Sequence, residues 1–200
     1  MTKYDVARFV ANKLGDVTPM KLQKLVYYVY AWGLVAVGKP LFRAHFEAWK
    51  FGPVDPDLYR TYKSFGNSPI PVDNSVAALP EKLEELVHFI VDSYGHLTAL
   101  ELSKTSHLEK PWKTHAPYAG LIPDDELLSF YGHADFARNF PIDRTRRYTP
   151  PTTSADLNYS FDLNDKYDPS YENIDEYLAS VRRARHHVRV SLGRASYDVG

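Results

Sequence analysis

Residues 18–53 have the sequence TPMKLQKLVYYVYAWGLVAVGKPLFRAHFEAWKFGP. Thr18 and Pro19 favour a helix start, because threonine is a good N-cap and proline is tolerated in the first turn. Apolar residues then recur at spacings of three and four, which predicts a helix that buries one face. Gly38 can end this helix by adopting a positive φ. The apolar positions are Leu22, Leu25, Val26, Val29, Tyr30, Gly33 and Val37.

An aromatic run at residues 46–51 follows this helix and ends at Gly52 and Pro53. The run alternates too little to demand a sheet, but it allows a short strand or hairpin around residues 45–52. We expect Trp49 to be a core residue, because the glycine and proline after it fix the turn. A long apolar helix followed by a stiff aromatic turn is a rigid centre for other helices.

Further amphipathic helices are expected on both sides of this centre, so the predicted fold is mainly α and compact. Capping boxes are recognisable at Thr2 with Asp5 and at Thr98 with Glu101. Asp124 is expected to cap another helix. The expected segments are 2–14, a helix from Asp55-Pro56 to Gly66, 80–94, a helix starting at Thr98, a short turn or helix at Pro111-Trp112, and a helix from Asp124 to Gly132.

Composition narrows the class of protein. Two hundred residues suit one domain or one domain with a small appendage, and 44% of them are hydrophobic. The net charge of −1 gives no general attraction to nucleic acid or anionic lipid. The sequence has no cysteine, which excludes disulfides and cysteine-zinc sites and fits a cytoplasmic protein. No apolar run approaches the ~20 residues of a membrane helix.

The amino-acid composition changes at Pro141, so we expect a domain at 1–140 and a separate segment at 141–200. The second segment begins as an extended linker, poor in aliphatic residues, and a final amphipathic helix is expected at about 170–192. Seven acidic residues and one lysine lie between Asp156 and Glu176, whereas five arginines and two histidines lie between Arg182 and Arg194.

This charge pattern has two interpretations. Acidic residues near a helix start and basic residues near its end suit the helix dipole. The alternative is a partner-binding tail, for a protein first and a nucleic acid second. The candidate contacts in the tail are Tyr171, Tyr177, Arg182, Arg185 and Arg189.

No enzyme motif is present. The eight histidines include one near-cluster, His107 with Glu109 and His115, but it lacks the spacing of a metal site. We expect His107 to form a structural hydrogen bond to backbone or to a tyrosine. No serine-nucleophile elbow or phosphate-binding loop occurs. The sequence therefore predicts a protein that is not an enzyme and uses no metal or cofactor.

The polar residues at the start of the long helix also have two interpretations. Gln23 can reach inward to a backbone group of the aromatic turn while Lys21 and Lys24 remain hydrated. Alternatively, Lys21, Lys24 and Lys50 form a basic rim around exposed aromatic residues, a surface for a partner. Trp32 fits either the core or such a surface.

Several motifs in series resemble the Panacea domain family, which includes SocA-like antitoxins and phage-associated GepA-like proteins. They are Lys-Leu-Gln-Lys-Leu with Tyr-Tyr at 21–28, Gly-Lys-Pro-Leu-Phe at 38–42, Glu-Ala-Trp-Lys-Phe-Gly-Pro-Val at 47–54, and Leu-Ser with His and Pro-Trp at 102–112. The resemblance covers roughly 3–135, with Ser106 before His107 where the family has Thr-His. We interpret the following motif residues as structural: Leu22, Gln23, Tyr27, Tyr28, Trp49, Gly52, Pro53, Tyr59, His107 and Trp112.

The resemblance implies an antitoxin that neutralises a toxin from a neighbouring gene by direct binding. It leaves open an adaptor that delivers the toxin to a protease, a DNA-binding autoregulator that uses Arg182–Arg194, and a homo-oligomer. We expect the helical domain to be the platform and residues 141–200 to supply toxin-specific contacts. On this hypothesis, deleting 141–200 abolishes neutralisation while the domain stays folded.

Overall fold

The structure is a computed structural model that describes residues 1–73, 78–116 and 119–152. Residues Met1–Thr153 form one compact unit. It contains helices α1 (Lys3–Leu14), α2 (Pro19–Val37), α3 (Pro56–Tyr62), α4 (Glu81–Tyr94), α5 (Ala99–Leu108), α6 (Lys110–His115) and α7 (Asp124–Gly132). The strands are β1 (Phe46–Trp49), β2 (Gly52–Val54) and β3 (Leu121–Ile122), and the short 3-10 helices are η1 (Lys63–Phe65) and η3 (Asp135–Asn139).

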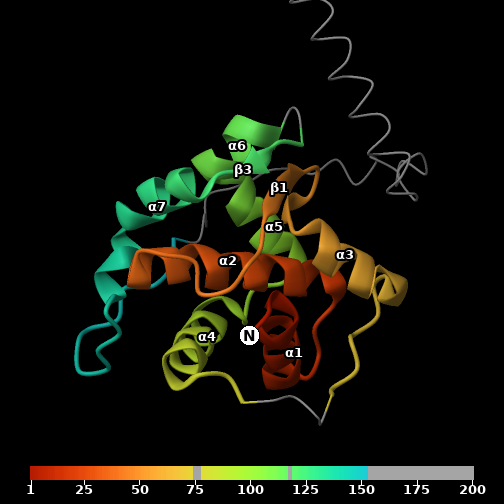
Figure 1. Cartoon of the computed structure of the whole chain (residues 1–200), viewed down its shortest axis with the longest axis horizontal. Coiled ribbons are helices and arrows are strands. Elements are labelled where there is room, and N and C mark those ends of the chain that lie inside the picture. Colours follow the sequence, from red (N-terminus) through yellow and green to blue (C-terminus); the bar gives the residue numbers. More distant parts are fainter. Residues whose placement is uncertain (74–77, 117–118, 153–200) are drawn as a thin grey trace, which may run out of the picture. The chain divides into compact units, whose positions relative to one another are not determined.

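Helix α2 is the centre of this unit, and the other helices pack around it. It contacts α1, α3, α4, α5, α7 and β2. Figure 1 shows α1 and α4 on one side of it and β1 and α6 on the other. Every residue from Leu22 to Leu34 is buried. The expectation that one face is buried was therefore wrong, because a helix surrounded by packing partners buries all of its faces.

The predicted helix signals correspond to helix ends in the structure. Both capping boxes are present, at Thr2 with Asp5 and at Thr98 with Glu101. Gly38 ends α2 with φ of 74°. One start differs: Pro123 is the N-cap of α7, and Asp124 lies in the first turn, where its carboxylate accepts a hydrogen bond from the Tyr30 hydroxyl at 2.9 Å.

The predicted hairpin is present as β1 and β2, with Ala48 opposite Pro53. Strand β3, a two-residue strand, was not expected. It pairs antiparallel with β1, so that the sheet order is β2-β1-β3. So short a strand has no hydrophobic period, and it depends on the backbone of β1. For example, the Ala48 amide donates to the Gly120 carbonyl at 2.9 Å.

Residues 141–152 pack against the helical core. The Asn139 side chain donates to the Thr149 carbonyl at 2.8 Å and accepts from the Thr149 amide at 2.9 Å. The Tyr148 ring contacts Phe89 and Phe136 edge-on. The compact unit thus continues past Pro141, where the composition changes, to Thr153. The helix expected at about 170–192 lies outside the described residues.

In the described part of the chain, no helix is long and apolar enough to cross a membrane.

Candidate functional site

Side chains from three helices hold the backbone of the β1–β2 turn. The Trp112 indole donates to the Trp49 carbonyl at 2.8 Å, and the Ser103 hydroxyl donates to the Phe51 carbonyl at 2.9 Å. The Lys24 ammonium donates to the Pro53 carbonyl at 2.9 Å. We call Lys24, Ser103 and Trp112 the hairpin clamp. It fixes the turn, and leaving a buried carbonyl such as that of Pro53 without a partner would cost about 1–3 kcal/mol.

Gly52 lies at the tightest point of the clamp. Its φ is 101°, a conformation that residues with a side chain rarely adopt. A Cβ atom at this position would lie 2.6 Å from the Ser106 hydroxyl oxygen and 2.7 Å from Cε of Lys24. Both the backbone conformation and the available space therefore require glycine here.

Lys24 is 1% exposed, which is unusual for lysine. Burial lowers the pKa of its ammonium to about 7. Ser106 is also fully buried, although serine can act as a nucleophile in enzymes. Its hydroxyl donates to the Ser103 carbonyl at 2.8 Å. Both groups are closed to solvent. The Lys24 ammonium holds the hairpin, whereas the Ser106 hydroxyl bonds within its own helix α5.

His107 packs against Trp112 of the hairpin clamp. Their rings stack with centroids 3.9 Å apart and planes 22° apart. Burial lowers the pKa of His107 to about 4, with the charge of Lys24 as a second cause, although a hydrogen bond to the Lys50 backbone opposes the shift. A neutral imidazole stacked on an indole is a packing group. Among the described residues, no group of three or more histidine and acidic side chains could hold a metal.

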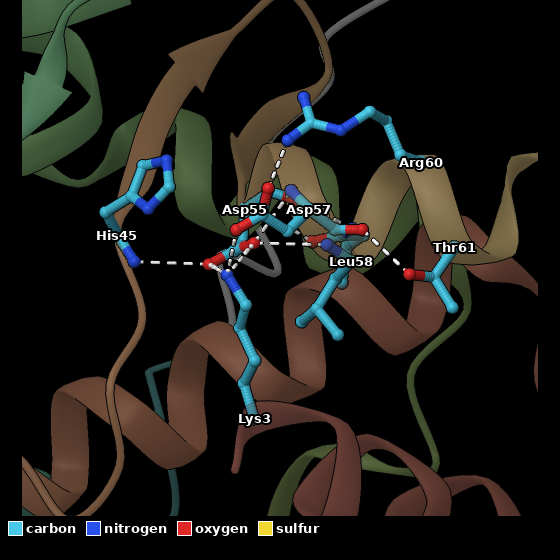
Figure 2. Close-up of polar contacts among 8 residues, drawn as sticks. Lys3, His45, Asp55, Asp57, Leu58, Arg60 and Thr61 are labelled. Atoms are coloured by element: carbon cyan, nitrogen blue, oxygen red, sulfur yellow. Dashed lines mark hydrogen bonds and ion pairs between the residues drawn. The ribbon is translucent and has the colours of Figure 1, made fainter.

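A second polar network lies at the far end of β2, around the fully buried carboxylate of Asp55 (Figure 2). The Lys3 ammonium donates to its two oxygens at 2.7 and 2.8 Å. The carboxylate also accepts from the backbone amides of His45, Asp57 and Leu58, at 3.1, 3.0 and 3.1 Å. Asp55 thus caps α3 and joins it to α1.

Asp57 shares the Lys3 ammonium, at 2.8 Å. Burial alone would lower the pKa of Lys3, but the hydrogen bonds and charges of Asp55 and Asp57 outweigh it and raise that pKa. The hydrogen bond from Lys3 in turn lowers the pKa of Asp57. Arg60 also donates to Asp57. The network thus pairs two basic side chains, Lys3 and Arg60, with two carboxylates, Asp55 and Asp57.

Gln23 connects α2 to this network. Its amide donates to the Asp55 carbonyl at 3.2 Å and accepts from the Asp55 amide at 3.1 Å. Gln23 therefore reaches inward to a backbone group, as predicted, but this group belongs to Asp55, two residues after the aromatic turn. Helices α1, α2 and α3 therefore meet at one residue, Asp55.

The segments that carry the hairpin clamp match a known protein family. Residues 22–113 match the family model described as "Antitoxin SocA-like, Panacea domain". Antitoxin SocA of Caulobacter vibrioides (strain NA1000 / CB15N) is 33% identical over 127 residues, which cover 53% of this chain and 68% of that protein. The chain belongs to the SocA-like Panacea family. No solved structure matches it.

The matched part of the Panacea domain includes all three clamp residues and Gly52, whereas Lys3 lies before it. The motif residues interpreted as structural lie in or against the core. Tyr59, His107 and Trp112 are half-buried, and the others are buried: Leu22, Gln23, Tyr27, Tyr28, Trp49, Gly52 and Pro53.

The expected basic rim does not form a continuous surface in this Panacea domain. Lys50 is exposed, but Lys21 is half-buried, and its ammonium donates to the Gly95 carbonyl at 2.7 Å. Lys24 and Trp32 are buried, and the Trp32 indole donates to the Tyr94 hydroxyl at 3.0 Å. Neither Lys24 nor Trp32 can contact a partner of the folded domain. The remaining candidates, Tyr171, Tyr177, Arg182, Arg185 and Arg189, lie outside the described residues.

A cluster of tyrosines that was not expected from the sequence surrounds the Glu109 carboxyl. The Tyr131 hydroxyl donates to it at 2.6 Å and the Tyr28 hydroxyl at 3.2 Å. Tyr131 also donates to the Tyr27 hydroxyl at 3.2 Å. Burial raises the pKa of Glu109 to about 8, although both hydrogen bonds oppose the shift. The only signal was the number of tyrosines, which says nothing about which carboxyl they surround.

Replacing Glu109 with glutamine should stabilise the domain at pH 8 by roughly 2–4 kcal/mol. The unfolded chain loses this proton near pH 4.5, whereas the folded protein retains it to about pH 8. The free energy of unfolding of the wild type therefore falls as pH rises between these values, and glutamine removes that fall. Urea unfolding at pH 5 and pH 8 measures the difference.

The gain should shrink towards zero at pH 5, and Glu85→Gln, which alters a partly exposed glutamate on α4, should show no comparable pH dependence. An equal effect of Glu109→Gln at both pH values would contradict the buried, protonated carboxyl.

Proposed function

We propose that this protein is an antitoxin that acts in the cytoplasm and neutralises the toxin encoded by a neighbouring gene by binding it directly. The observation that carries the proposal is the family membership, since the chain covers 68% of a relative named as an antitoxin. The structure supports binding in place of catalysis, because Lys24 and Ser106, the side chains nearest to a catalytic pair, are both buried and donate their hydrogen bonds to the backbone carbonyls of Pro53 and Ser103. A standard interface of about 1,600 Å² would suffice to block a toxin.

Two parts of the chain are proposed to share this work. The Panacea domain is the rigid platform, and the residues after Thr153 supply contacts that depend on the toxin. The support for the second part is compositional: five arginines between Arg182 and Arg194 follow an acidic stretch, and both are suited to a charged partner. Because residues 141–152 pack on the domain, the test truncation belongs after Thr153 and not at Pro141.

A variant ending at Thr153 should remain folded but lose protection against the toxin. The core contacts of Tyr148 and Thr149 are retained, so its circular dichroism and melting temperature should stay close to those of the full chain. Co-expression with the neighbouring gene's product, scored for growth and for co-purification, measures protection. Full protection by the truncated protein would show that residues 154–200 are dispensable.

A full-length variant tests whether the positive charge of the residues after Thr153, and not only their presence, is required. Arg182→Gln, Arg185→Gln and Arg189→Gln together should weaken binding of the toxin, whereas the same changes at the exposed Arg138 and Arg144 should not. If the tail variant instead loses binding to its own promoter DNA, with a steep dependence on salt, the tail serves autoregulation. If the full-length wild type neither binds nor protects against the neighbour, the antitoxin proposal fails.

A further inference from the structure

We propose that the tip of the β1–β2 hairpin is a docking surface for an acidic protein surface with an apolar pocket, and that this acidic surface belongs to the toxin. This inference rests on the proposed antitoxin function and adds the face that is used and the chemistry of its partner. The tip surface consists of two apolar residues, Phe51 and Leu100, and four lysines around them: Lys50, Lys104, Lys110 and Lys113.

A large aromatic side chain is exposed at the tip, on a backbone that is held rigidly. Phe51 is 51% exposed, although its carbonyl is fixed by Ser103 of α5 at 2.9 Å. The preceding residue Lys50 is held through its backbone by His107. The side chain of Phe51 is thus presented by a backbone that α5 holds. A pre-organised anchor loses little entropy on binding, which is a known source of affinity.

Helix α5 adds a second exposed apolar side chain. Leu100 is 45% exposed and lies one helical turn before Ser103, the residue that holds Phe51. Lys104 follows Leu100 by four residues and therefore lies on the same side of α5. An apolar centre with a charged border is the arrangement found in interface hot spots.

Most of the charged side chains that border the tip surface are basic. Lys50 belongs to the hairpin turn, and its ammonium lies 5.6 Å from the centre of the Phe51 ring. Lys110 and Lys113 are exposed on α6, the helix whose Trp112 contacts the Trp49 carbonyl. Two nearby carboxylates are those of Glu47, which accepts from the Trp49 indole, and Glu101, which accepts from Thr98, and the four lysines outnumber them. The border of the tip surface is therefore basic, which favours an acidic partner.

An apolar centre favours a protein over a nucleic acid. Phe51 and Leu100 can fill a pocket in a protein, whereas a phosphate backbone would use the lysines and leave the leucine without a partner. The clamp residues are not part of the tip surface, because they point inward. The surface can therefore be altered without loosening the hairpin.

The full-length chain and the neighbouring gene's product provide the test. Phe51→Ala should raise the dissociation constant at least about 30-fold. Leu128→Ala, which removes an exposed leucine from α7, is the matched control and should leave it unchanged. Equal melting temperatures of both variants and the wild type establish that the fold is intact.

A charge reversal tests the border independently. Lys50→Glu with Lys113→Glu should slow association about tenfold at low salt and reduce its salt dependence. The control is Lys39→Glu with Lys82→Glu, two exposed lysines on other parts of the domain. If the wild type binds the toxin and the tip variants bind as tightly as their controls, the docking surface is overturned while the antitoxin function stands.

Two other outcomes would also overturn the proposed docking surface. If the tip variants lose promoter DNA but retain the toxin, the surface binds nucleic acid and the proposal is overturned. If the wild type does not bind the neighbour at all, the antitoxin function fails and the docking surface fails with it.

Discussion

Replacing Gly52 with alanine is expected to destabilise the domain by on the order of 2–5 kcal/mol, a large part of the total stability of a domain of this size. Two costs add. The positive φ of 101° is strained for alanine, at about 1–2 kcal/mol. The added methyl group must also displace Ser106 and Lys24, whose atoms lie 2.6 and 2.7 Å from its position, and overpacking of this kind costs about 1–3 kcal/mol.

Gly38→Ala is the matched control for Gly52→Ala. Gly38 also has a positive φ, 74°, but a Cβ there meets no atom within 4 Å. The free energy of unfolding of this control should fall only by the conformational cost, about 1 kcal/mol. Urea unfolding of the two variants therefore measures the contact with the clamp as a difference. If the two variants were equally stable, Ser106 and Lys24 could move away from the added methyl group without a cost in free energy, and the packing around Gly52 would not be tight.

Replacing Asp55 with alanine is expected to cost about 3–5 kcal/mol. The change removes the cap of α3 and leaves the buried Lys3 ammonium with Asp57 alone. It also takes an acceptor from the amides of His45, Asp57 and Leu58. The loss should appear as a lower melting temperature and a lower urea midpoint.

A double-mutant cycle with Lys3→Met isolates the ion pair from the cap. The loss caused by Asp55→Ala should be smaller in the Lys3→Met background, because no buried cation is then left without its main partner. Asp5→Ala is a useful comparison, since it removes a carboxylate from an exposed capping box and should cost only about 1 kcal/mol. Additive losses for Lys3 and Asp55 would show that their 2.7 Å contact contributes nothing.

The local structure was largely predictable. Helix caps at Thr2, Thr18, Asp55 and Thr98 depend on hydrogen bonds within about four residues, so the sequence pattern specifies them. The hairpin was predictable for the same reason, because Gly52 and Pro53 impose a turn after an aromatic run. Strand β3 was not predictable, because its pairing with β1 crosses more than seventy residues of chain.

The candidate site was predictable only in part. The inward hydrogen bonds of Gln23 were anticipated, whereas Lys24, on the next position of the same helix, was expected at the surface and is buried. The sequence does not indicate whether the ammonium of a lysine will contact a distant backbone carbonyl, such as that of Pro53. The same is true of Lys3 and Asp55, which are 52 residues apart and meet in the interior.

The sequence by itself determined the helical class, the helix ends, the hairpin and the resemblance to an antitoxin family, since these depend on local hydrogen bonding, on periodicity and on ordered motifs. Only the tertiary structure decided which charged groups are buried, how the clamp holds Gly52, and that Phe51 remains exposed at the tip. The physical reason is that burial and pairing of charges depend on side chains that are distant in sequence, and their energies are set by the packed environment and not by the residue type.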